Sequence, residues 1–302
     1  MTWFEEIFGF RETKENINNY ITIKENKMFS SANNRSFLYG DLETPTLKNL
    51  RNRLPEENGS IQVSEIIGDI KELHKNEEHA LFQVASQFNL LEMMSPAITK
   101  EQGITRYLSD MTQGPACAIA CAAGTLYRNY YTNVNTLDNI ENMFDEKYWT
   151  MKNGYALFEE KELFKFNNII DRFEETIKEN LKVGIQWNTE VVKTGKTVSQ
   201  IYCSALPVSY NYNIEKDDFE KFARLILEAT YEATFIASIL NNKSNKVYLT
   251  LVGAGAFGNE REWVIGSIKK NIKKFKNYDI DVVLVNYSEY YGNIHLKEFY
   301  TK

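Results

Sequence analysis

The sequence predicts an α/β fold in three layers, with helices on both faces of a mixed, largely parallel sheet. Short apolar segments rich in β-branched and aromatic residues end at glycine or polar residues, which is the pattern of buried strands. Longer segments place apolar residues on one helical face. The two kinds of segment alternate, which is typical of a parallel sheet covered by helices. The expected strands span residues 61–67, 80–85, 198–207, 247–252 and 280–287, and the clearest expected helices span residues 116–130, 219–240 and 260–275.

The first 60 residues precede the first expected strand of this sheet. They combine a short amphipathic start, which includes Trp3 and Phe4, with polar segments rich in Asn and Lys, and they end in the turn-forming stretch 55–60. We therefore expect an N-terminal extension over residues 1–60 that packs on a main domain over residues 61–302.

Polar residues follow the first two expected strands of the main domain. Asp69 comes just after residues 61–67, and Asn89 comes just after residues 80–85. Ligands of open α/β sheets bind beyond the carboxyl ends of the strands, which favours a binding role for both side chains. The alternative is that each is a turn residue or a helix cap, as Asp and Asn often are.

A long loop, Leu90–Gly114, separates the second expected strand from the helix at 116–130. Loops longer than about 12 to 15 residues without structure of their own are usually functional or disordered, although part of this one is expected to be helical. Its end places Gln113 and Gly114 before Pro115, which suits the first turn of a helix. Because helix N-termini present free N–H groups, this end is a possible anion site.

Residues 131–195 are expected to form an insertion in the main domain or a peripheral layer. They hold a polar stretch, the short apolar run Tyr155–Phe158 and a segment of helical periodicity at 164–181. The long helix that follows the next strand is expected to begin after Asp217 or Asp218, because either residue would serve as its N-cap.

The glycine-rich turn Gly253–Gly258 joins the strand at 247–252 to the helix at 260–275. A strand that feeds a helix through small residues brings backbone N–H groups close enough to bind a phosphate. Acidic residues begin that helix and lysines end it, as the helix macrodipole favours. The alternative is a tight strand-to-helix turn that binds no ligand.

Composition limits the classes of function. The 302 residues are 43% hydrophobic and 25% charged, which is typical of a globular protein. The net charge of −6 argues against broad nucleic-acid or membrane-surface binding. The sequence shows no apolar run long enough to span a bilayer and no secretory signal at its start, so we expect a cytoplasmic protein.

The cysteines and histidines do not form a metal-binding pattern. Cys117, Cys121 and Cys203 lack the spacing of a close ligand pair, so we expect buried free thiols in a reducing compartment. The three histidines are scattered through the chain. We therefore expect no metal ion and no other cofactor.

Three motifs resemble the macrodomain family, whose members bind ADP-ribose. Gly68-Asp69-Ile70 resembles the end of the family's first strand, and Val84–Asn89 resembles the family strand that ends in an asparagine. Gly253–Asn259 resembles the family's second phosphate loop. The motifs occur in the family's order, and the resemblance covers about residues 61–129 and 196–290. It implies a macrodomain-like fold.

The resemblance implies a role for each motif. A carboxylate at Asp69 accepts a hydrogen bond from the adenine amino group, and the amide of Asn89 bonds the hydroxyls of the distal ribose. The glycine turn surrounds the diphosphate, because glycine permits close backbone approach, and Phe257 lies against the ribose. The ligand-binding residues expected on this basis are Asp69, Ile70, Asn89, Thr112, Gln113, Gly114, Gly253, Ala254, Gly255, Ala256, Phe257, Gly258 and Tyr287.

The chain departs from hydrolytic members of the family where catalysis would occur. Leu90–Pro96 replaces a run of glycines, and Gly114-Pro115 replaces the paired glutamates that follow a glutamine in the glycohydrolases. The catalytic candidates are therefore Glu92 and Asp110 of the replaced loop, either of which could orient or deprotonate a water, together with Asn89. The alternative for either carboxylate is a solvated loop residue or a cap.

Two functions remain open. The first is hydrolysis of an ADP-ribosyl N- or O-glycosidic bond on a protein, a nucleic acid or a small ADP-ribose derivative. The second is a non-catalytic reader or sequestering module for ADP-ribose or an NAD-derived signalling nucleotide. The polar loop with its acids favours the hydrolase, whereas the missing glycines favour the reader. A degenerate domain used for protein interaction is a third possibility and predicts no nucleotide binding.

Overall fold

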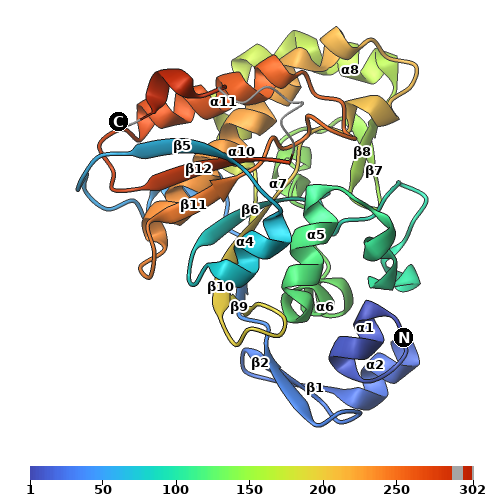
Figure 1. Cartoon of the computed structure of the whole chain (residues 1–302). Coiled ribbons are helices and arrows are strands. Elements are labelled where there is room, and N and C mark those ends of the chain that lie inside the picture. The colour runs from blue at the N-terminus through green and yellow to red at the C-terminus, as the bar shows by residue number, and fades with distance from the viewer. Residues whose placement is uncertain (288–294, 301–302) are drawn as a thin grey trace.

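The protein has a central seven-stranded sheet with helices on both sides, as a computed structural model that describes residues 1–287 and 295–300 shows (Figure 1). From edge to edge the strands are β4 (Asp41–Glu43), β9 (Gly184–Glu190), β10 (Thr197–Cys203), β6 (Leu81–Ala85), β11 (Lys246–Leu249), β12 (Asp281–Asn286) and β5 (Gln62–Ile67). Pairing from β10 to β5 is parallel, whereas β9 runs antiparallel to β10 and to β4. The predicted α/β class with a mixed, largely parallel sheet is confirmed.

Alternate side chains of the strands face two different layers of helices. Leu81, Val282 and Leu284 pack with the long helices α10 (Glu220–Leu240) and α11 (Arg261–Lys274). Their strand neighbours, which include Phe82, Val84 and Val283, pack on the other face. That face is covered by α4 (Ile70–Asn76), α5 (Gln113–Ala120) and α6 (Ala122–Tyr131). The continuous apolar runs in the sequence therefore arise because these strands are buried on both faces.

The expected strands and long helices are present, with two corrections to the helices. The single helix predicted at 116–130 is two helices, because Cys121 has a non-helical backbone, with φ −118° and ψ 59°. The N-cap predicted at Asp217 or Asp218 is wrong. Both residues lie in a 3₁₀ turn, Lys216–Phe219, that runs directly into α10, so Phe219 occupies the cap position without a side-chain bond.

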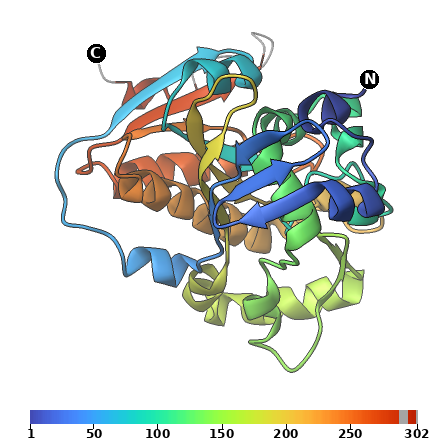
Figure 2. The same ribbon diagram turned by 90° about the horizontal axis from the view of Figure 1, so that it is seen from below.

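The N-terminal region forms a small unit whose apolar core includes residues of α5, α6 and the Leu90–Gly114 loop. It comprises α1 (Trp3–Phe8), α2 (Lys14–Tyr20) and an antiparallel sheet of β1 (Ile21–Lys24), β2 (Lys27–Ser30) and β3 (Arg35–Leu38). The unit lies beside α6 (Figure 2), and its buried aromatic residues belong to the same apolar cluster as Ala122, Leu126 and Tyr107. The next segments join the main body, because β4 is the edge strand of the central sheet and α3 (Leu47–Arg51) packs on α10.

Residues 131–195 combine a peripheral layer with a strand of the central sheet. The peripheral elements are α7 (Asp138–Glu141), the hairpin of β7 (Trp149–Lys152) and β8 (Tyr155–Phe158), α8 (Glu160–Ile169), the 3₁₀ turn Ile170–Arg172 and α9 (Glu174–Asn180). The strand is β9. The domain boundaries expected at residues 60, 131 and 195 stay predictions.

The three cysteines are free and buried, as predicted. Among the described residues, none of the helices is both long enough and apolar enough to span a bilayer.

Candidate functional site

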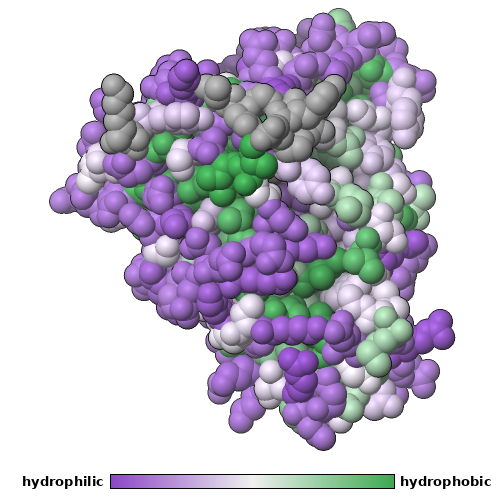
Figure 3. All heavy atoms as spheres, in the orientation of Figure 1, coloured by the Kyte–Doolittle hydropathy of each residue, from purple (hydrophilic) through white to green (hydrophobic). Residues whose placement is uncertain are grey.

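The segments that follow β5, β6, β10 and β11 lie at the carboxyl-terminal end of the central sheet. They are the start of α4 after β5, the Leu90–Gly114 loop after β6, the segment 204–210 after β10 and the glycine turn after β11. Apolar side chains gather over β5 and β12, beside the polar surface of α4 (Figure 3). The carboxyl ends of parallel strands are where open α/β sheets bind ligands.

The Gly253–Gly258 turn is a tight loop with unused backbone donors. Gly253 and Gly258 have positive φ angles, +79° and +73°, which glycine adopts without strain. The turn is closed by bonds from the Gly258 N–H to the Gly255 carbonyl, 2.9 Å, and from the Asn259 N–H to the Gly253 carbonyl, 2.9 Å. Within the described part of the chain, the N–H groups of residues 255–257 donate no hydrogen bond. The turn therefore offers three consecutive donors to an anion.

The base of the turn is fastened to the segment that follows β10. The buried amide of Asn259 donates to the Leu206 carbonyl at 2.8 Å, and the Ser209 N–H donates to the Phe257 carbonyl at 3.0 Å. A Cβ atom added to Gly258 would lie 1.8 Å from the Ser209 hydroxyl oxygen, whereas one added to Gly255 would meet nothing within 4 Å. Close packing therefore requires glycine at 258, whereas no described residue excludes a side chain at 255.

An aromatic cluster borders the glycine turn. The Phe257 ring lies 5.4 Å from the ring of Tyr155 and 5.8 Å from that of Tyr210, centre to centre. Tyr155 donates from its hydroxyl to the Met93 carbonyl at 2.6 Å, and Tyr210 donates to the Met94 carbonyl at 3.2 Å. The cluster therefore connects the glycine turn to the Leu90–Gly114 loop. Neither tyrosine was expected at the site, and the only local signal for Tyr155 in the sequence is the apolar run 155–158.

Asp69 is exposed at the end of β5 and caps helix α4. One carboxylate oxygen accepts a hydrogen bond from the Lys71 N–H at 2.8 Å. No described residue bonds its other oxygen. The neighbouring Ile70 is buried and packs with the α5 side of the sheet. Asp69 is thus a helix cap, which is one of the two roles that the sequence predicts for it. Its second carboxylate oxygen remains available at the surface.

Asn89 lies within a turn that the β7–β8 hairpin covers. Its side-chain oxygen accepts a hydrogen bond from the Leu91 N–H at 3.1 Å. Gly154 of the hairpin packs so closely that an added Cβ atom would lie 2.5 Å from the Asn89 amide carbon. The Gly154 carbonyl also accepts a bond from the Phe88 N–H at 3.0 Å. Asn89 remains half-buried, with its oxygen engaged in the turn.

The end of the Leu90–Gly114 loop presents Asp110 close to the aromatic cluster. Its carboxylate accepts hydrogen bonds from the N–H and the hydroxyl of Thr112, at 2.8 and 2.6 Å. Burial raises the pKa of the Tyr155 phenol, and the charges of Tyr210 and Asp110 add to the increase. Asp110 is half-buried, so solvent reaches this carboxylate at the border of the cluster.

Gln113 and Gly114 fix the loop end to strand β6. The Gln113 amide accepts a bond from the Ala85 N–H at 3.0 Å and donates to the Gln83 carbonyl at 2.8 Å. Gly114 is buried, and a Cβ atom there would lie 2.0 Å from the Ala85 carbonyl oxygen. Both residues therefore act in the packing of α5 on the sheet, and both polar atoms of Gln113 are already bonded.

Glu92 is buried beside Arg128 rather than solvated in a loop. Its carboxylate lies 3.5 Å from the Arg128 guanidinium, and the two side chains are 1% and 0% exposed. Burial raises the pKa of the Glu92 carboxyl to about 7, although the positive charge of Arg128 opposes the increase. One oxygen of Glu92 and one terminal nitrogen of Arg128 have no hydrogen-bond partner among the described residues. Arg128 was not expected at the site, because a single sequence does not show which residue a buried acid meets.

Tyr287 follows β12 and is largely exposed. It is the last described residue before the segment 288–294, which lies outside the described residues. No described contact links it to the glycine turn. The candidate site is thus formed by the glycine turn, the aromatic cluster and the two loop acids, with Asp69 at its α4 side.

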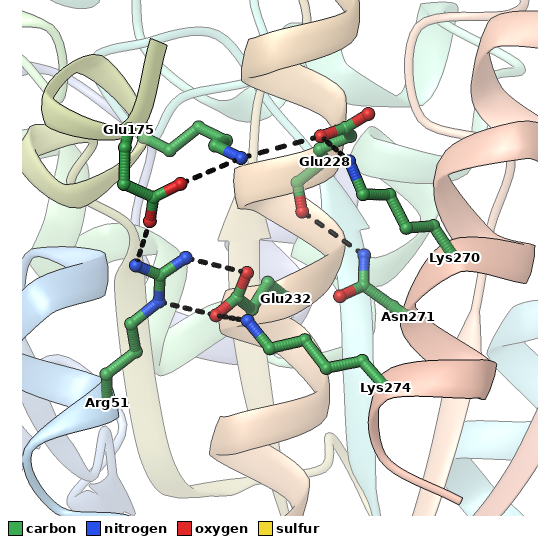
Figure 4. Close-up of a pocket in the computed structure, with 8 residues that line it drawn as sticks. Arg51, Glu175, Glu228, Glu232, Lys270, Asn271 and Lys274 are labelled. Atoms are coloured by element: carbon green, nitrogen blue, oxygen red, sulfur yellow. Dashed lines mark hydrogen bonds and ion pairs between the residues drawn. The ribbon is translucent and has the colours of Figure 1, made fainter. Parts of the chain in front are cut away.

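A separate hollow of about 290 Å³ lies among helices α3, α9, α10 and α11, away from the carboxyl ends of the strands (Figure 4). It is lined by Arg51, Glu175, Lys178, Glu228, Glu232, Lys270, Asn271 and Lys274. Its acids and bases are joined in ion pairs, such as that of Arg51 with Glu232 at 2.5 Å. We interpret the ion pairs that line this hollow as a network that ties the four helices together.

Comparisons with known proteins give distant structural matches alone. No protein-family model matches the chain, and no curated protein matches it in sequence. A poly(ADP-ribose) glycohydrolase from Thermomonospora curvata is similar in structure, with a TM-score of 0.48 and 9% identity over 91% of this chain and 92% of that one. The glycohydrolase from Deinococcus radiodurans in complex with ADP-ribose has a TM-score of 0.47 and 10% identity over 81% and 87%. Identities this low transfer no residue's role to this chain.

Proposed function

We propose that this chain is a divergent macrodomain that binds ADP-ribose or an ADP-ribosyl group and hydrolyses its glycosidic bond. The observation that carries the proposal is the glycine turn. Its N–H groups at residues 255–257 have no described acceptor and lie at the carboxyl end of a parallel strand. A diphosphate satisfies such a set of donors without needing a lysine.

We propose that other residues at this end of the sheet bind the remaining parts of the ligand. The free oxygen of Asp69 accepts a hydrogen bond from an adenine amino group, since an ionised carboxylate is an acceptor only. Phe257, within the turn, offers an apolar face to a ribose. The sugar beyond the diphosphate would then lie towards the Leu90–Gly114 loop, whose residues contact the aromatic cluster.

Hydrolysis of the glycosidic bond needs a water near the anomeric carbon and a group that takes its proton. Asp110 is the stronger candidate for this base, because solvent reaches it at the border of the aromatic cluster. Glu92 is the second candidate, and its raised pKa is typical of catalytic acids and bases. Its burial means that the loop must open before it meets a water.

A non-catalytic reader is the second candidate function. The burial of Glu92 against Arg128 and the engagement of the Asn89 oxygen in a turn favour it, because both residues are then structural. Such a reader would bind ADP-ribose or an NAD-derived nucleotide through the same turn and release nothing. For either function we propose a cytoplasmic location, which the three free, buried thiols support.

Calorimetric titration with ADP-ribose, NAD and AMP tests the binding proposal. The wild type should bind ADP-ribose, and Asp69→Asn should weaken the binding of both ADP-ribose and AMP by about tenfold, the loss of roughly one hydrogen bond to a charged group. Asparagine caps a helix about as well as aspartate, so this substitution leaves α4 intact. Absence of ADP-ribose binding by the wild type would overturn the proposal.

Release of ADP-ribose from ADP-ribosylated protein and nucleic acid then separates hydrolase from reader. Asp110→Asn should reduce turnover by about 100-fold, within the range of a general base, while the Kd for ADP-ribose stays unchanged. A wild type that binds ADP-ribose and shows no turnover on any of these substrates would establish the reader.

A further inference from the structure

The N-terminal unit supplies a carboxylate to the loop that carries both candidate acids. Glu12 lies between α1 and α2, far in sequence from the site. Its two oxygens accept hydrogen bonds from the N–H groups of Ile104, 2.7 Å, and Thr105, 2.6 Å. The Tyr130 hydroxyl donates a third bond to Glu12 at 2.8 Å. One side chain thus bonds two successive backbone donors of the Leu90–Gly114 loop and one residue of α6.

Further contacts surround this carboxylate. The Trp3 indole N–H donates to the Thr105 carbonyl at 2.8 Å. Gly103 has φ +79°, and a Cβ atom there would lie 2.6 Å from the Glu12 carboxylate. Ile104 and Tyr107 are buried in the same core as the aromatic residues of α1. The N-terminal unit therefore holds the loop segment 103–107 both by hydrogen bonds and by apolar packing.

The segment that Glu12 holds leads directly to the candidate acids. The 3₁₀ turn Thr105–Ser109 begins at the bonded residue and ends one residue before Asp110, whose N–H donates to the Tyr107 carbonyl at 3.2 Å. The Tyr107 hydroxyl accepts a bond from the Glu92 N–H at 3.1 Å. A shift of this turn would therefore move both Asp110 and Glu92.

We propose that Glu12 is a positioning residue that holds the Leu90–Gly114 loop in the arrangement needed for hydrolysis; this rests on the proposed function. A carboxylate suits the role because two backbone N–H groups then bond a charged acceptor, which gives stronger and more directional bonds than neutral acceptors. The N-terminal unit is in this view a component of the site and not an appendage to it.

Hydrogen exchange and kinetics on Glu12→Gln test the proposal. A glutamine has a single acceptor oxygen, and its NH₂ group faces the other backbone N–H, so one bond is lost. Backbone exchange over residues 103–110 should accelerate by about tenfold or more. The kcat should fall by about tenfold, because the reacting geometry is disturbed, while KM and the Kd for ADP-ribose change less than about twofold. Glu15→Gln, on the exposed first turn of α2, is the matched control and should change none of these.

Gly103→Ala gives a second variant that disturbs the same contact from the loop side. Its added Cβ atom would push the loop away from the Glu12 carboxylate without altering the N-terminal unit. Unchanged exchange over residues 103–110 in both variants, or faster exchange with an unchanged kcat, would overturn the proposal. If the wild type neither binds nor hydrolyses ADP-ribosyl substrates, the proposed function fails, whereas the exchange comparison still decides whether Glu12 holds the loop.

Discussion

Arg128 and Glu92 form an ion pair inside the protein, 3.5 Å apart, with Arg128 also lying 3.6 Å from the centre of the Tyr202 ring. The pair connects α6 to the Leu90–Gly114 loop. Removing one member of a buried pair leaves an uncompensated charge, which is far more destabilising than removing both. Glu92 and Arg128 should therefore be strongly coupled.

Arg128→Met should lower the free energy of unfolding by about 3 kcal/mol, because Glu92 is left without its partner. The double variant Arg128→Met with Glu92→Gln should recover part of that loss, as measured in urea. Arg224→Met is the control, since its half-exposed pair with Glu220 contributes less than about 1 kcal/mol. Additive effects of the two changes would show that the residues are not coupled.

Glu92→Gln should alter how stability depends on pH. Burial raises the pKa of Glu92 from 4.5 in the unfolded chain to about 7 in the folded protein. The folded protein therefore binds this proton more tightly than the unfolded chain does. The resulting contribution to the free energy of unfolding is fully present below pH 4.5 and is lost as pH rises through 7. Between pH 4.5 and 8, the wild type should lose on the order of 2–3 kcal/mol relative to Glu92→Gln. Parallel curves for the two proteins would contradict the raised pKa.

Two alanine substitutions in the glycine turn should have different effects. Gly258→Ala collides with Ser209 and needs a positive φ, so it should lower the free energy of unfolding by about 2 kcal/mol or more and weaken ADP-ribose binding. Gly255→Ala meets open space in the free protein, so its stability should be unchanged. If the diphosphate lies against this backbone, as we propose, Gly255→Ala should still weaken binding by about tenfold. Unchanged affinity in Gly255→Ala would place the ligand elsewhere.

Acid should loosen the ion-pair network between α3, α9, α10 and α11 (Figure 4). Although burial opposes it, hydrogen bonds from Arg51 and Lys178 lower the pKa of Glu175 to about 2, and bonds from Arg51 and Lys274 lower that of Glu232. A lowered pKa gives stability that is present above pH 4.5 and lost as pH falls towards 2. Unfolding free energies measured over this range should fall less steeply in Arg51→Met than in the wild type. An equal slope in the two proteins would show that Arg51 does not cause this loss of stability in acid.

The central fold was predictable because its signals are local. The strands β5, β6, β11 and β12 are short apolar runs that end in polar or glycine residues, and α10 shows its apolar face over many turns. The break at Cys121 was not predictable in this way. Residues 116–124 around the break are all small or apolar, so their pattern does not show where the helix is interrupted.

The candidate site was predictable only in part, because its contacts join distant segments. The glycine turn is visible as a motif, and Asp69 and Asn89 follow strands. Tyr155, Tyr210 and Arg128 reach the site by tertiary packing from the peripheral layer, the segment after β10 and the end of α6. A residue whose partner is set by topology has no local signal in one sequence.

The edge strand β4 has a consequence for synthesis of the chain. Its hydrogen-bonding partner on the sheet is β9, so Asp41–Glu43 cannot pair until residues 184–190 have left the ribosome. The N-terminal unit can close its local sheet of β1 to β3 early, since those strands are neighbours in sequence. Until then β4 stays unpaired. Folding intermediates with an unpaired strand and exposed apolar surface are the kind that chaperones protect. Folding of this protein during translation should therefore pause between an early N-terminal unit and a late closing of the sheet edge.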